Sequence, residues 1–191
     1  MIIILCGYVG YKLTDDFSLY AKEVMLYNEI KAAQVGTLLL YLRPIVGVTV
    51  GFMADRSKSS DWIVIGFMLM LVGSSLLASG VATAGAFIIF ALSLLATCLG
   101  VFAIRSLYFA SMEEGNIPLA VTGTAVGVVS LVGFTPEIFV GLIMGALLDN
   151  SPGILGHQHV FMMLAGFSVV GLVAAVFLRR EVNNKDLDIG K

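Results

Sequence analysis

Long apolar stretches separated by short polar breaks run through the whole chain, and this pattern predicts membrane-spanning helices. A helix needs about 20 mainly apolar residues to cross a hydrocarbon core roughly 30 Å thick. Several stretches meet this length, and two of them carry a charge and a proline near the middle, Arg43 with Pro44 and Glu137 with Pro136. We expect six spans, at about residues 1–25, 32–54, 62–79, 84–109, 122–148 and 159–178. They would form one six-helix bundle over residues 1–178, followed by a polar tail over 179–191.

The first of these spans is the least regular. Its apolar run reads MIIILCGYVGY and ends at Lys12, so it is too short to cross a bilayer unless the helix continues to about Met25. A signal peptide is the competing interpretation, but it would need positive charge ahead of the apolar run, and Met1 leads directly into isoleucine. We therefore expect a helix that carries Lys12, Asp15 and Asp16 into the membrane.

Composition agrees with a membrane protein built only from helices. Hydrophobic residues make up 59% of the 191 residues and charged residues 13%, whereas soluble domains carry about 25% charged residues. The net charge of −2 gives no reason to expect nucleic acid as a partner. Cys6 and Cys98 lie inside apolar stretches and are typical of small core residues rather than a disulfide.

The distribution of Lys and Arg predicts an orientation. If the break at Arg56 and Lys58 is cytoplasmic, alternation of the spans places both chain termini on that side as well. The basic residues on that side then outnumber those on the other, as the positive-inside rule requires. The cytoplasmic set is Arg56, Lys58, Arg105, Arg179, Arg180, Lys185 and Lys191, against Lys22 and Lys31 on the other side.

Five ionisable residues fall within three predicted spans, which is more than chance would place there. Each costs at least about 2.5–3.5 kcal/mol at membrane depth, and such residues usually face a partner or a water-filled cavity. Tyr8, Lys12 and Asp15 share one helix face, and Asp16 is also four residues from Lys12. A polar path lined by spans one, two and five is one interpretation. The other is that Lys12 and an aspartate neutralise each other and the first helix ends early. The five residues are Lys12, Asp15, Asp16, Arg43 and Glu137.

Glycine spacing predicts close helix packing in spans two and five. Pairs of glycines four residues apart place small residues on one helix face, which favours close helix contacts in lipid. The pairs are Gly47 with Gly51, Gly123 with Gly127, and Gly141 with Gly145.

Residues 51–60 read GFMADRSKSS, and this stretch resembles a loop of the major facilitator superfamily, Gly-x-Leu-Ala-Asp-Arg-x-Gly-Arg-Lys. In that superfamily the loop joins the second and third helices of each six-helix half on the cytoplasmic side. Gly51, Ala54, Asp55 and Arg56 match, whereas Met53 replaces leucine, Lys58 replaces glycine, and Ser59 and Ser60 replace the basic pair. Residues 42–56, LRPIVGVTVGFMADR, look like a second-half helix that runs into this loop.

A second segment is similar to a particular branch of the superfamily. Residues 113–149 read EEGNIPLAVTGTAVGVVSLVGFTPEIFVGLIMGALLD and resemble the fourth-to-fifth-helix region of carriers related to nitrate and organophosphate transporters. The resemblance implies an all-α membrane protein whose six transmembrane helices are one half of a major facilitator fold, helices seven to twelve in the family's order. It also implies a secondary active transporter of the bacterial inner membrane that works by alternating access.

Site roles follow from the resemblance and from the charge pattern together. Arginine suits carboxylate or phosphate, so we expect a small anionic solute, with proton coupling by acids in the spans. The binding set would be Tyr8, Lys12, Arg43 and Glu137; the proton-coupling set Asp15, Asp16 and Glu137; and the gating set Gly51, Asp55, Arg56, Arg105, Glu113 and Glu114. The alternative for Asp55 is a helix cap, and for Glu113 and Glu114 simple solvation.

Other functions are weaker candidates. A non-transporting sensor or a truncated module is the main alternative, and an intramembrane serine hydrolase is a minor one. The hydrolase would need His157 or His159, which we expect in the loop before the last span without a matching nucleophile. The two histidines lack further ligands for a metal site, and no Gly-x-x-x-x-Gly-Lys loop indicates ATP binding. We expect no cofactor and no enzyme activity. The partners we expect are the bilayer, the solute, and an N-terminal six-helix half or a second copy of the chain.

Overall fold

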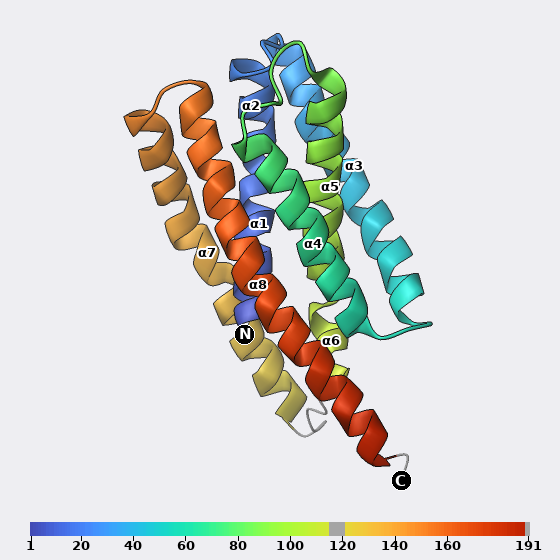
Figure 1. The fold of residues 1–191 in the computed structure, drawn as a ribbon. Helices are drawn as coiled ribbons and strands as arrows, with labels where there is room; N and C mark the ends of the chain where they lie inside the picture. The colour runs from blue at the N-terminus through green and yellow to red at the C-terminus, as the bar shows by residue number, and fades with distance from the viewer. Residues whose placement is uncertain (115–120, 190–191) are drawn as a thin grey trace.

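A computed structural model describes residues 1–114 and 121–189, with side chains except at 111, 113, 114 and 185–189. Every regular element in this part of the chain is helical, and the helices lie side by side as a bundle (Figure 1). The elements are α1 (Ile2–Leu13), η1 (Thr14–Asp16), α2 (Phe17–Glu23), α3 (Glu29–Ala54), α4 (Ser59–Ala78), α5 (Phe87–Ser106), α6 (Tyr108–Glu114), α7 (Thr122–Asn150) and α8 (Ile154–Ile189).

Five of these helices are long and apolar enough to cross a membrane: α3, α4, α5, α7, and α8 over Ile154–Asn184. They coincide with five of the predicted spans, so the prediction of an all-α membrane protein is confirmed. The predicted span 84–109 extends three residues beyond α5, which stops at Ser106 and is followed by the separate short helix α6.

The first predicted span is a broken helix rather than a continuous one. α1 has 12 residues, η1 has 3 and α2 has 7, so none of them alone meets the length for a crossing. The break is a tighter 3₁₀ turn at Thr14–Asp16, where the Thr14 hydroxyl donates to the Tyr11 carbonyl at 2.7 Å. Figure 1 shows the three pieces following one another from the lower to the upper end of the bundle.

The last helix is much longer than predicted at both ends. α8 begins at Ile154, directly after Gly153 with its φ of +76°, and therefore includes the two histidines that we expected in a loop. It also continues through residues 179–189, which belong to the stretch that we expected to follow the last span as a polar tail. Contacts with the start of α4 hold this extension: Arg179 pairs with Asp61, and Lys58 donates to Asn183.

Close helix packing occurs between α4 and α5, not at the predicted glycine pairs. A Cβ built on Gly100 would lie 2.3 Å from the Gly66 carbonyl oxygen, and one on Gly73 would lie 2.5 Å from the Ser93 carbonyl oxygen. The prediction of close packing within this chain at spans two and five was wrong, because those glycines face open space or, at Gly47, a single atom 4.0 Å away. The open ones are Gly51, Gly123, Gly127, Gly141 and Gly145.

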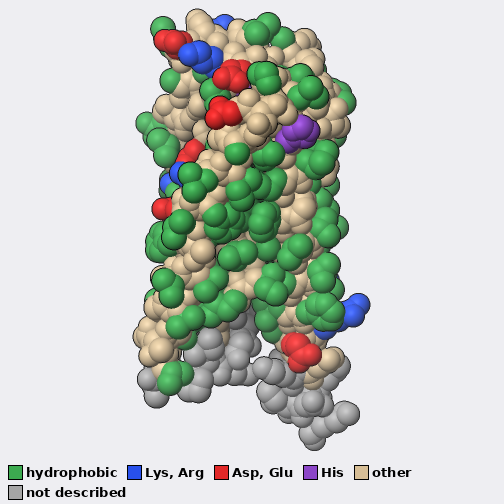
Figure 2. Space-filling view, turned by 90° about the vertical axis from the view of Figure 1, so that its left-hand side faces the viewer, with side chains coloured by type: hydrophobic (Ala, Val, Ile, Leu, Met, Phe, Trp, Pro, Cys, Tyr) green, Lys and Arg blue, Asp and Glu red, His purple; other side chains and the backbone are tan. Residues whose placement is uncertain are grey.

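The arrangement leaves one side of α1, that of Tyr8, Tyr11 and Lys12, only partly buried. α1 packs against α5, α7 and α8, while α3 packs mainly against α2 and α5 and makes no extensive contact with α1. α3 and α7, which flank this side, are the least buried spans. Only 17% and 22% of the residues in their apolar stretches are buried, against 56% for α5. On the face that carries α7, hydrophobic side chains cover the middle and charged side chains gather towards the upper end (Figure 2).

Candidate functional site

Two arginines from different helices converge on one tyrosine of α1. The guanidinium carbon of Arg105, in α5, lies 3.5 Å from the centre of the Tyr11 ring, and that of Arg43, in α3, lies 4.6 Å from it. Arg105 also lies 5.2 Å from the Tyr8 ring, and Arg43 lies 5.6 Å from the Phe102 ring. Cations attract the faces of aromatic rings at these distances, so the rings hold two like charges close together.

Each of the two arginines has a buried N–H group that lacks a hydrogen-bond acceptor. Nε of Arg43 and Nη1 of Arg105 are buried and make no hydrogen bond. Within the described part of the chain, neither guanidinium forms an ion pair with a carboxylate. Two uncompensated cations with free N–H groups favour an anion, and guanidinium geometry suits carboxylate or phosphate oxygens.

Lys12 and its acids lie beside this pair but largely neutralise one another. The Lys12 ammonium donates to Asp15 Oδ2 at 3.0 Å, with side-chain exposures of 34% and 62%. Glu137 of α7 also interacts with Lys12 through space. The pairing of Lys12 with an aspartate and the end of α1 at Leu13 both match the alternative left open above, although helical structure resumes in η1 and α2.

Tyr8, predicted to bind solute, lies in an aromatic cluster. Its ring stacks on Tyr108 with centroids 5.6 Å apart and meets Phe134 of α7 edge-on at 5.5 Å. Its contact with Arg105 connects this cluster to the arginine pair.

The predicted gating residues divide between two places. Asp55 and Arg56 are exposed in the α3–α4 connection, where the Arg56 guanidinium lies 4.3 Å from the centre of the Phe52 ring, and Gly51 faces open space. Arg105 instead joins the arginine pair at Tyr11. The side chains of Glu113 and Glu114 lie outside the described residues.

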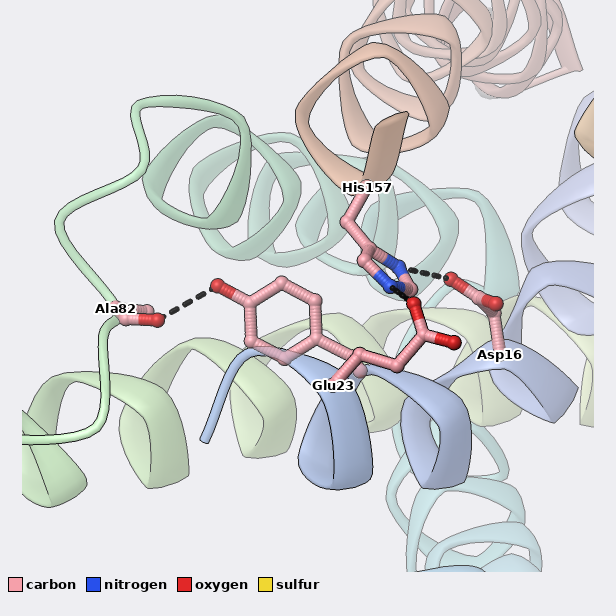
Figure 3. Close-up of polar contacts among 5 residues, drawn as sticks. Asp16, Glu23, Ala82 and His157 are labelled. Carbon is pink, nitrogen blue, oxygen red and sulfur yellow. Dashed lines mark hydrogen bonds and ion pairs between the residues drawn. The ribbon is translucent and has the colours of Figure 1, made fainter. Parts of the chain in front are cut away.

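A second polar cluster joins the first segment to α8, and the sequence analysis did not anticipate it. His157 is fully buried; its Nδ1 lies 3.2 Å from Asp16 Oδ2 and its Nε2 lies 3.0 Å from Glu23 Oε2 (Figure 3). The Asp16 side chain is also fully buried, whereas that of Glu23 is 43% exposed. Of the two predicted proton-coupling aspartates, Asp16 therefore faces a histidine and Asp15 faces a lysine.

Aromatic rings lie next to this cluster and reach it through Tyr20. Tyr20 meets the His157 ring edge-on at 5.3 Å, stacks on Phe90 at 5.5 Å, and meets Phe161 at 5.5 Å. Its hydroxyl donates to the Ala82 carbonyl at 2.7 Å, which attaches α2 to the α4–α5 connection (Figure 3). A signal in the sequence points to this arrangement, because Asp16, Tyr20 and Glu23 are spaced to share one helix face.

The described residues contain no group of three or more His, Cys, Asp or Glu side chains arranged to hold a metal ion. Distances of 3.0 and 3.2 Å around His157 are those of hydrogen bonds.

Long apolar helices with charged side chains held inside the bundle define this chain as an all-α integral membrane protein. No model of a protein family matches it. It is similar to two inner membrane proteins of Escherichia coli K12: YihN, at 34% identity over 44% of this chain, and YqcE, at 35% identity over 38%. The matched stretches span only 20% and 16% of the lengths of these relatives. The apolar helices and both relatives together support an integral protein of the inner membrane.

Proposed function

We propose that the chain is one six-helix half of a secondary active transporter of the major facilitator type, which moves a small anionic solute by alternating access. The observation that carries the proposal is the pair of half-buried arginines at Tyr11, each with a buried N–H that lacks an acceptor. Keeping two like charges inside an apolar bundle is costly. A bound anion would offset that cost, and binding and release of that anion on opposite sides of the membrane would transport it.

The sixth span in this proposal is the broken segment α1–η1–α2. At about 1.5 Å per residue, the residues from Ile2 to Glu23 reach about 30 Å, which matches a hydrocarbon core. Broken helices at membrane depth are tolerated where they line a cavity, and they frequently form binding sites in transporters. The break at η1 begins two residues after Lys12, close in the chain to the proposed solute site.

A partner would cover the open side of α1. The low burial of α3 and α7 and the uncovered glycines on both helices fit a second six-helix half seated there, either an N-terminal half or a second copy. In transporters of this type the solute site lies between two such halves. The arginine pair lies beside this open side, as the proposal requires.

The cluster at α8 removes His157 from the hydrolase alternative, which is left with the exposed His159. Both ring nitrogens of His157 already face carboxylates, so neither is left to take a proton from a serine. The sensor alternative shares the anion site but predicts binding without transport, and the experiment below separates the two.

Anion binding is tested by thermal stability of the detergent-solubilised chain with inorganic phosphate or sulfate, using uncharged sugar as the osmotic control. A ligand at 100 times its dissociation constant stabilises the folded state by about 2.7 kcal/mol. We expect either anion to raise the Tm of the wild type but not of Arg43→Ala or Arg105→Ala. Arg180→Ala is the matched control, because it removes an exposed arginine far along α8. Equal stabilisation of all four proteins would contradict the anion site.

Transport is tested on the complex purified through this chain and reconstituted in phosphate-loaded liposomes. We expect exchange of labelled external phosphate for internal phosphate, abolished in Arg43→Ala and partly retained in Arg43→Lys, which keeps the charge but loses the planar fork. Binding without exchange in the wild type would favour the sensor over the transporter.

A further inference from the structure

The imidazole of His157 lies between two acids that come from another part of the chain. Asp16 belongs to η1 and Glu23 to α2, and each carboxylate approaches a different ring nitrogen (Figure 3). A neutral imidazole has one N–H donor, whereas carboxylates only accept. Donation to both acids therefore requires the imidazolium, with a proton on each nitrogen.

The two carboxylates make this proton hard to lose while the contacts persist, because they favour the charged ring and outweigh the cost of burying it. His157 and the Asp16 side chain are fully buried; Asp16 Oδ2 faces the ring, and Asp16 Oδ1 makes no hydrogen bond. If the imidazolium lost its proton, two carboxylates would face a ring able to satisfy only one of them, in surroundings lined by Tyr20, Phe90 and Phe161. Buried charge without a partner is strongly unfavourable.

Glu23 is the member of the cluster that is able to leave. Its side chain is 43% exposed, whereas those of His157 and Asp16 are enclosed. Its helix, α2, is a single short helix that follows the 3₁₀ turn η1, and such turns inside a helix often mark hinges. Outward movement of α2 would bring Glu23 into water and leave His157 with Asp16 alone.

We infer that His157, Asp16 and Glu23 form a proton-binding site that holds α2 against α8 while the proton is bound and frees α2 when it leaves. Of the described ionisable side chains, Asp16 and Glu23 act on the ring charge, and Tyr20 meets its edge while donating to Ala82. Because η1 also adjoins Tyr11 and Lys12, movement of α2 would reach the solute site directly. That coupling to transport rests on the proposed function, whereas the proton site does not.

The protonation of His157 is measured by NMR of the detergent-solubilised chain with 15N-labelled histidine. The chain has two histidines, so His159→Gln leaves the His157 signal alone, and His157→Gln identifies the exposed His159 as a reference. At neutral pH we expect both nitrogens of His157 to carry a proton. In Glu23→Gln, which replaces a half-exposed side chain and so threatens folding least, we expect one nitrogen to lose its proton at lower pH than in the wild type. A singly protonated His157 in the wild type at neutral pH, or an identical titration in Glu23→Gln, would overturn the proton site.

Whether the His157 cluster keeps α2 against α8 is tested by hydrogen–deuterium exchange. His157→Gln is compared with His159→Gln at the same pH, so that intrinsic exchange rates cancel. We expect amides of Phe17–Glu23 to exchange about tenfold faster in His157→Gln, with α4 unchanged as the internal reference. In the wild type the same acceleration should accompany loss of the His157 proton as the pH rises. Equal exchange of α2 in both variants would overturn the hold. None of these readouts uses an anion, so a failed anion titration would leave them intact.

Discussion

Two adjacent aspartates at the break in the first segment have different surroundings. Asp15 pairs with Lys12 at 3.0 Å while 62% of its side chain stays exposed, so water screens the pair. Asp16 is fully buried, and its Oδ2 lies 3.2 Å from Nδ1 of His157. The 3₁₀ turn aims the two carboxylates at different partners, one beside the proposed solute site and one at α8.

Replacing each aspartate by asparagine separates their contributions. Asp16→Asn should lower the free energy of unfolding by about 2–4 kcal/mol, because it removes a buried charge partner of His157 while Glu23 remains. Asp15→Asn should change it by about 0–1 kcal/mol, as for an exposed ion pair. Reversible unfolding in mixed micelles of increasing dodecyl sulfate content measures the free energy of unfolding of both variants. Equal effects would mean that Asp16 is not engaged with the imidazole.

The sequence alone predicted part of this chemistry. The rule that charges within apolar runs serve function selected five candidates, whose roles stay predictions: Lys12, Asp15, Asp16, Arg43 and Glu137. It did not find His157, because its acidic partners lie 141 and 134 residues away and only the fold brings them together. Arg105 was assigned to a gate because it stands near a helix end, yet the length of its side chain carries its charge to Tyr11.

At the scale of helices, apolar length predicts where a span lies but not how it packs or ends. The positions of α3, α4, α5 and α7 were predicted to within a few residues. The extension of α8 depends on tertiary contacts with Asp61 and Lys58, which no local pattern contains. Likewise, the spacing of glycines is the same whether a helix face meets another helix or remains uncovered. Spacing alone therefore predicted close packing at α3 and α7, whereas the close contact lies between α4 and α5.

A pair of glycine substitutions measures that contact. Gly100→Ala should lower the free energy of unfolding by about 1–3 kcal/mol, because its Cβ would meet the backbone of α4, at 2.3 Å from the Gly66 oxygen, where no side chain can turn away. Gly141→Ala places the same methyl in open space on α7 and should be neutral or slightly stabilising, since alanine favours helix. The same unfolding assay measures both variants of the isolated chain. A cost for Gly141→Ala equal to that for Gly100→Ala would contradict the packing described above.

At the scale of the whole molecule, the two ends of the bundle differ in charge. The α3–α4 connection and the C-terminal part of α8 lie at the lower end in Figure 1 and carry Arg56, Lys58, Arg179 and Arg180. The upper end carries Lys22, which pairs with Glu29 at 3.0 Å, and Lys31. This asymmetry, together with the positive-inside rule, predicts that the lower end is cytoplasmic.

Single cysteines test that orientation and the number of crossings together, in a background where the buried Cys6 and Cys98 are replaced by alanine. Four exposed positions are used. Ile2 lies at the N-terminus, Leu26 between α2 and α3, Ser57 between α3 and α4, and Pro152 between α7 and α8. If α1–η1–α2 crosses the membrane, a membrane-impermeant maleimide added to intact cells should label Leu26→Cys and Pro152→Cys but not Ile2→Cys or Ser57→Cys. Labelling of Ile2→Cys together with Leu26→Cys would mean that the first segment does not cross and that the chain has five spans. The odd number would then place the two termini on opposite sides, and a face-to-face half-transporter of six helices would be ruled out.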